Sequence, residues 1–313
     1  MKMAVVGGIK GNMLEEVTVP IDDSTFSQID KARNDLLEML DMEITYDHIM
    51  EEFTSFKGKM KESNIRALRG VLYRGHEHIH ETRSSLNRTA FNLLNLSKFY
   101  LDKHCYDNQS KSFVLNLTAN KKLHEEVVKL RRSAFENNLY YTFGGVLRNV
   151  VQHHQLPVES MSSGISRANL QDKPISSFSL PIDMNKVAPL VKPNADKRAM
   201  AKVLEDAEFK PDLHKILDGY VYALGTFHTL NRTLVADAIK DAKRVLREFE
   251  IEVMGGEFQP DTSVRIIDLL EYTGDDEAPL FHLDLSWYKV ADYLQNKNGR
   301  AVDYSQFEFN SYL

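Results

Sequence analysis

The sequence has only one cysteine, Cys105, so an intrachain disulfide is impossible. A chain without disulfides is typical of a reducing compartment, and we expect a cytoplasmic protein. No apolar run approaches the about 20 residues needed to cross a bilayer. The start of the chain also lacks the long apolar core of a secretory signal. The sequence therefore predicts that the protein does not associate with membranes.

The chain also lacks the excess of basic residues that is typical of proteins that coat nucleic acids. Its 39 Lys and Arg residues face 45 Asp and Glu residues, which gives a formal net charge of -6 and a pI near 6.0. This balance argues against broad electrostatic capture of DNA or RNA, but it is compatible with a small basic cleft. The 313 residues, 42% hydrophobic and 27% charged, suffice for one large or two ordinary globular domains.

Apolar residues recur at spacings of three and four over most of the chain, which predicts a mainly α fold arranged as a helical bundle. We expect helices near residues 22–40, 45–61, 65–101, 123–135, 139–154, 196–207 and 211–253. The third of these is long for a single helix, and a break near Gly75 or Ser84 is expected. Pro157 ends the helix that begins at Leu139, because proline cannot continue the hydrogen-bond ladder.

Two segments have a different character. Residues 1–21 contain valine-rich pieces and predict a short extended arm or hairpin, and residues 159–195 are rich in Ser, Pro and Asn, with one alternating piece at 175–182 that predicts a strand. The chain therefore divides into an N-terminal arm or hairpin (1–21), a helical domain (22–158), a loop-rich connector (159–195) and a second helical region with a mixed C-terminal tail (196–313).

The run Arg148-Asn149-Val150-Val151-Gln152-His153 is the main candidate for a functional site. It places an obligate cation, a carboxamide and an imidazole within about two helical turns. An arginine can bind a phosphate, and a histidine can move a proton near neutral pH, so this combination suits a phosphodiester. The pair Gly144 and Gly145, one turn earlier, would let a partner helix or a phosphate backbone approach closely.

These six residues resemble the signature of the HEPN superfamily, in which an Arg, an adjacent polar residue, a short spacer and a His form a metal-independent ribonuclease site. The resemblance implies a HEPN-like domain at 22–158, with no cofactor or metal. It implies that Arg148 holds the scissile phosphate, that Asn149 orients His153 or the phosphate, and that His153 is the general acid or base.

The resemblance also implies partners and a biological setting. The substrate would be RNA, and the site would form where the motif helices of two copies face each other, so a homodimer is expected. A toxin or a phage-defence effector, with an antitoxin or a regulatory partner, would fit such an activity.

An acidic protein needs a local basic groove to hold RNA. Arg131 and Arg132, on the preceding helix, and His154, beside His153, are the candidate substrate contacts. His154 is also a second candidate for the reactive imidazole. The alternative is that Arg148 and His153 only complement the dipole at the end of a surface helix.

Two other functions are compatible with the sequence. The long helix expected at 211–253 carries an apolar stripe that would suit either an intrachain core or a dimer seam, so a non-catalytic interaction protein is one alternative. The other is a zinc hydrolase, because His76, Glu77 and His80 match the His-Glu-x-x-His pattern of zinc sites. A third ligand for that zinc is not evident downstream.

Overall fold

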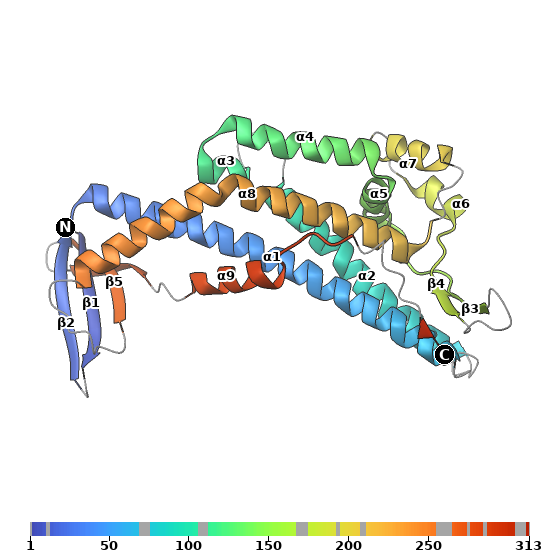
Figure 1. Cartoon of the computed structure of the whole chain (residues 1–313), viewed down its shortest axis with the longest axis horizontal. Helices are drawn as coiled ribbons and strands as arrows, with labels where there is room; N and C mark the ends of the chain where they lie inside the picture. Colours follow the sequence, from blue (N-terminus) through green and yellow to red (C-terminus); the bar gives the residue numbers. More distant parts are fainter. Residues whose placement is uncertain are drawn as a thin grey trace. The chain divides into compact units, whose positions relative to one another are not determined.

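The computed structural model describes residues 2–10, 13–68, 76–105, 112–166, 175–191, 195–206, 211–254, 265–273, 276–283, 287–303 and 311–312. Within these ranges the protein is mainly α, as the sequence predicts (Figure 1). The helices are α1 (Asp23–Leu68), α2 (His76–His104), α3 (Phe113–Thr118), α4 (Lys121–Asn137), α5 (Leu139–His153), α6 (Met184–Val187), the 3-10 helix η2 (Ala188–Leu190), α7 (Ala195–Glu205), α8 (Leu213–Met254) and α9 (Tyr288–Lys297). The strands are β1 (Lys2–Lys10), β2 (Met13–Ile21), β3 (Ser162–Ser166), β4 (Ile175–Ser179), β5 (Arg265–Thr273), β6 (Asp276–His282) and β7 (Ser311–Tyr312). Of the helices in the described ranges, none has an apolar stretch that would let it span a bilayer.

The chain forms two compact units, each assembled from separate segments of sequence. Unit 1 comprises Met1–Ile44 and Leu234–Lys297, and unit 2 comprises Thr45–Thr233 and Asn298–Leu313. Both α1 and α8 therefore contribute residues to each unit. Sequence analysis divided the chain into four consecutive segments with boundaries near residues 21, 158 and 195. That division is of another kind than the two units and stays a prediction.

Unit 1 is built around a four-stranded antiparallel sheet in the order β2-β1-β5-β6. Residues 1–21, expected as an arm or hairpin, supply the antiparallel pair β1 and β2, and β1 also lies beside β5 (Figure 1). In the pairing of β1 with β5, Ala4 lies opposite Leu269. Ala4, Ile267 and Leu269 are buried. The N-terminal segment is thus an integral part of a sheet, whose other strands come from the last fifth of the chain.

Helix α1 is one continuous helix, which corrects the expectation of two helices at 22–40 and 45–61. The buried residues Met39, Met42 and Tyr46 continue the three- and four-residue spacing between those two ranges. The helix begins after Asp22, whose carboxylate accepts hydrogen bonds from the backbone N–H (2.8 Å) and the hydroxyl (3.0 Å) of Thr25.

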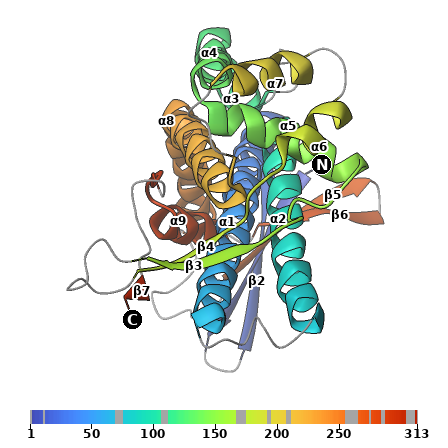
Figure 2. The same ribbon diagram turned by 90° about the vertical axis from the view of Figure 1, so that its right-hand side faces the viewer.

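Unit 2 is the helical bundle that holds the candidate site. Helix α5 contacts α2, α4 and α7, and the small sheet β3-β4-β7 lies in the same unit (Figure 2). Helix α2 is unbroken past Ser84, whereas Gly75 lies outside the described residues. The large side chains of the core include Phe53, Phe56, Leu86, Leu93, Phe143 and Phe227.

The apolar stripe of α8 is buried in the part that belongs to unit 2. Its members Leu213, Leu217, Leu224 and Phe227 each expose 0% of their surface. This part of the stripe therefore serves as intrachain core, which is the first of the two alternatives that the sequence left open.

Candidate functional site

Helix α5 carries the predicted motif, and its local sequence determines where the helix begins and ends. The side chain of Asn138 accepts a hydrogen bond from the backbone N–H of Tyr141 at 3.0 Å and so caps the first turn. Phe143, Leu147 and Val150 belong to the face that packs into the core. Burial of this face fixes the rotation of α5 and therefore the directions in which its polar side chains project.

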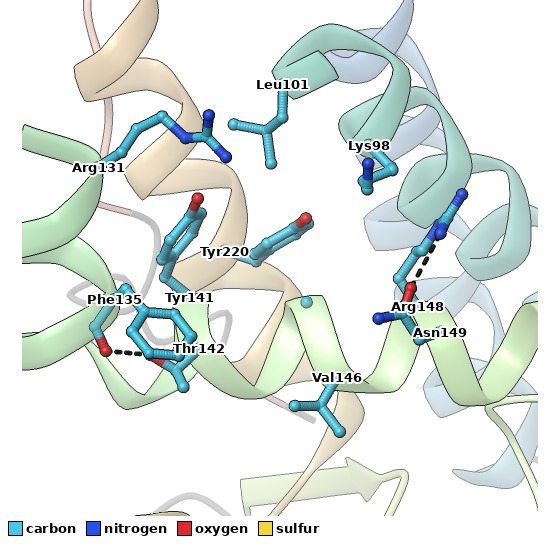
Figure 3. Close-up of a pocket in the computed structure, with 11 residues that line it drawn as sticks. Lys98, Leu101, Arg131, Phe135, Tyr141, Thr142, Val146, Arg148, Asn149 and Tyr220 are labelled. Atoms are coloured by element: carbon cyan, nitrogen blue, oxygen red, sulfur yellow. Dashed lines mark hydrogen bonds between the residues drawn. The ribbon is translucent and has the colours of Figure 1, made fainter. Parts of the chain in front are cut away.

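Arg148 and Asn149 line a cavity of about 150 Å³ next to α5. We call it the α5 cavity; its walls come from α2, α4, α5 and α8 and are formed by Lys98, Leu101, Arg131, Phe135, Tyr141, Thr142, Gly145, Val146, Arg148, Asn149 and Tyr220. Figure 3 shows the rings of Tyr141 and Tyr220 between Arg131 on one side and Lys98 and Arg148 on the other. Three cationic side chains thus surround a small space that also contains two phenol groups.

The three cations of the α5 cavity have different partners. Lys98 forms an ion pair with Asp102, and Arg131 donates a hydrogen bond to the backbone carbonyl of Cys105. Arg148 donates from Nη1 to Oδ1 of the neighbouring Asn149 at 2.9 Å, and its buried Nε has no hydrogen-bond partner among the described residues. A buried donor without a partner costs free energy, so an anion that reached the guanidinium of Arg148 would be stabilised there.

The two tyrosines of the cavity are held in their protonated form. Burial raises the pKa of Tyr141, while the nearby charge and hydrogen bond of Arg131 oppose that shift. Burial also raises the pKa of Tyr220. Both phenols therefore keep their protons near neutral pH and can act as hydrogen-bond donors toward an anion in the cavity.

The two histidines of the motif do not line the α5 cavity. His153 and His154 are exposed at the C-terminal end of α5, with ring centroids 6.4 Å apart. On an α-helix, a residue five positions after Arg148 is rotated by about 140° and displaced by about 7.5 Å along the axis, so one small cavity on α5 does not include both side chains. His153 is four positions after Asn149 and lies closer to its face of the helix.

The structure therefore brings together some of the predicted site residues and not others. Arg148, Asn149 and Arg131 line one cavity, whereas His153, His154 and Arg132 lie outside it. Asn149 contacts Arg148, so in this structure it positions the guanidinium.

Sequence reasoning did not identify Lys98, Tyr141 and Tyr220 as site residues. They belong to three different helices, and the periodicity of each helix assigns the tyrosines simply to its apolar face. The one related signal in the sequence was Gly144, which indicated that another helix could pack closely on α5; a Cβ atom there would lie only 2.6 Å from Cδ2 of Tyr220. The sequence allowed either a partner helix or a phosphate backbone to approach Gly144 and Gly145. At Gly144 the neighbour is Tyr220 of α8, whereas a Cβ atom on Gly145 would meet nothing within 4 Å.

The chain after the motif is anchored to α2 by Asn87. The buried side chain of Asn87 donates to the carbonyl of Val158 at 3.1 Å and accepts from its backbone N–H at 2.7 Å. This pair of hydrogen bonds fixes the segment that follows His153 and His154 against the neighbouring helix. The position of the exposed end of the motif thus depends on a contact between residues 71 positions apart.

The residues of the alternative zinc site lie at the start of α2. His76, Glu77 and His80 are exposed there. Within the ranges that the structure describes, no three His, Cys, Asp or Glu side chains are grouped so as to hold a metal ion. The His-Glu-x-x-His pattern therefore gains no third ligand from these residues.

Comparison with known proteins adds no relative. Searches with protein-family models, of curated proteins and of solved structures each found no match to this chain. The assignment of a function therefore rests on the chemistry of α5 and its surroundings.

Proposed function

We propose that this protein is a metal-independent endoribonuclease whose site is formed by Arg148, Asn149 and His153 at the C-terminal end of α5. The observation that carries the proposal is the state of Arg148. It is a partly buried guanidinium, held by Asn149, with an Nε that has no described partner, at the edge of a cavity with phenol donors. Such an arrangement favours an anionic ligand. A phosphodiester strand that extends from Arg148 to the exposed end of α5 is an anion on which the imidazole of His153 could also act.

In the proposed reaction, Arg148 binds a non-bridging oxygen of the scissile phosphate. The ribose 2′-OH loses its proton to a general base and attacks phosphorus, the bond to the 5′-oxygen breaks, and the leaving oxygen receives a proton from a general acid. His153 performs one of these two proton transfers, and the products are a 2′,3′-cyclic phosphate and a 5′-hydroxyl. No metal is required, because Arg148 stabilises the charge that develops on the phosphate oxygens.

The exposure of His153 supports a site that is completed by a second copy of the chain. His153 and His154 project from the end of α5 toward solvent, so a second motif helix can reach them. A homodimer of this kind would supply the second of the two proton-transfer groups. The exposed His154 is then a candidate contact to the bound RNA strand. A biological role of the protein as a toxin or a phage-defence effector remains a prediction.

The test is cleavage of an end-labelled, mixed-sequence RNA in the presence of EDTA. We expect Arg148→Gln and His153→Ala each to lower the rate at least about 100-fold, because each removes a group that acts in the transition state. Gln152→Ala is the matched control, since Gln152 is exposed on the same turn and has no assigned role. Equal rates in wild type and both site variants, with unchanged far-UV circular dichroism, would overturn the proposal.

A further inference from the structure

A second and larger cavity lies on the side of α2 that faces the segment after the motif. Its volume is about 370 Å³, within the range typical of ligand sites. We call it the α2 groove; it is lined by His80, Arg83, Ser84, Asn87, Arg88, Phe91 and Leu156. All but the last come from α2, at positions that recur every three or four residues and so form one face of the helix.

The two arginines of the α2 groove are exposed and have no ion-pair or hydrogen-bond partner among the described residues. Other exposed arginines of the chain, such as Arg66 and Arg244, form ion pairs with a glutamate one turn away. The positive charge of Arg88 also affects a neighbouring helix, because it adds to the burial that lowers the pKa of Lys59. In a chain with a net charge of -6, unneutralised cations gathered in one groove favour an anionic ligand.

The groove also offers an apolar surface. Phe91 is half-buried on its wall, and Leu156, which is 55% exposed, lies three residues after His153. The bonds of Asn87 to Val158 hold this segment against α2. The wall of the groove is therefore continuous along the chain with the end of the motif.

We infer that the α2 groove binds single-stranded RNA next to the site of cleavage. Phosphates of the strand contact Arg83 and Arg88, and a base packs against Phe91 and Leu156. An unpaired strand suits this surface, because its bases are free to contact aromatic and apolar side chains, whereas the bases of a duplex are stacked inside it. The inference deepens the proposed function and rests on it for the identity of the ligand as RNA.

The experiment measures binding without cleavage. A fluorescein-labelled 12-nucleotide strand of 2′-O-methyl RNA is titrated with the full chain, and fluorescence anisotropy is followed over a series of salt concentrations. The test variant is Arg83→Gln/Arg88→Gln. The matched control is Lys197→Gln/Arg198→Gln, which removes two exposed positive charges from α7, in the same unit but outside both cavities.

We expect the groove variant to raise Kd about 10-fold and to lower the slope of log Kd against log salt by about 1.4, since each lost phosphate contact on a single strand contributes about 0.7. The control should stay within about 2-fold of wild type, because its charges do not contact the strand. A groove variant that binds like the control, a wild type that does not bind the strand, or equal affinity for duplex RNA would overturn the inference.

Failure of the proposed function gives a different result. If the groove variant loses affinity as expected but wild type does not cleave unmodified RNA, the ribonuclease proposal is wrong and the inference that the α2 groove binds RNA is supported. If wild type cleaves RNA and the groove variant keeps both its affinity for RNA and its KM, the inference about the α2 groove is wrong and the ribonuclease proposal is supported.

Discussion

Replacing Gly144 by alanine would place a methyl group where the structure has no room for it. The added Cβ atom would lie 2.6 Å from Cδ2 and 2.8 Å from Cγ of Tyr220, a residue of α8 that is 1% exposed. The reverse contact is equally tight, because a Cβ atom on Gly219 of α8 would lie 2.5 Å from Cβ of Tyr140 on α5. The two helices therefore approach each other through a reciprocal pair of glycines. The added Cβ atom would also lie 3.2 Å from Cβ of Tyr220, so rotation of the Tyr220 ring does not relieve the whole contact.

Gly145 provides a matched control on the same turn of α5. A Cβ atom there would meet nothing within 4 Å. Both substitutions gain about 1 kcal/mol of helix propensity, because both replace a glycine inside a helix by alanine. Only Gly144→Ala also overpacks the core, at a cost of about 1–3 kcal/mol. The difference in unfolding free energy between the two variants is therefore expected to be about 1–3 kcal/mol, with Gly145→Ala the more stable.

The assay is urea unfolding followed by circular dichroism at 222 nm on wild type and both variants. We expect a lower midpoint for Gly144→Ala than for Gly145→Ala, with Gly145→Ala at or above wild type. The displaced ring of Tyr220 should also narrow the α5 cavity, which it lines, so Gly144→Ala should lower RNA cleavage as well. If Gly144→Ala were as stable as Gly145→Ala, the close approach of α5 and α8 would be refuted.

Three further predictions concern other parts of unit 2. Asn87→Ala should lower the unfolding free energy by about 2–3 kcal/mol, because the backbone groups of Val158 lose their partners, and an unchanged urea midpoint would contradict this. Burial and the charge of Lys57 lower the pKa of His214 to about 4, so between pH 6.5 and 4 the unfolded chain takes up a proton that the folded chain does not. The unfolding free energy should therefore fall by up to about 3 kcal/mol as the pH drops through this window, and His214→Gln should remove that part of the pH dependence in urea titrations. Arg148→Lys should keep the charge but lose the planar set of guanidinium donors, so the rate of RNA cleavage should fall about 10-fold or more while the far-UV circular dichroism spectrum stays the same. A wild-type cleavage rate in this variant would argue against binding of phosphate by the guanidinium.

The local sequence predicted α4 and α5 closely, because each has a clear signal at its ends. Asn120 and Asn138 cap the two helices through their side chains, and Pro157 follows the end of the second. The pairing of β1 with β5 had no such signal, because it joins residues about 265 positions apart and depends on tertiary contacts. The expectation of separate helices at 22–40 and 45–61 was wrong, because the buried Met42 continues the apolar spacing of α1 between the two ranges.

The candidate site was predictable in part. The residue types and spacing of Arg148, Asn149 and His153 can be read directly, since they lie within six residues of one helix. The convergence of Lys98 and Tyr220 on the same cavity depends on the packing of α2 and α8 against α5, which no local pattern specifies. For the same reason the sequence did not separate Arg148, which lines the cavity, from His153, which lies outside it.

The most direct test of the central claim is the chemistry of the RNA ends produced in the presence of EDTA, analysed by mass spectrometry. The proposed site predicts 2′,3′-cyclic phosphate and 5′-hydroxyl ends with the wild-type protein, formed at least about 100-fold more slowly with His153→Ala. Cleavage that requires a divalent metal, products with 3′-hydroxyl ends, or formation of cyclic phosphate by His153→Ala at the wild-type rate would contradict the assignment of α5 as a ribonuclease site.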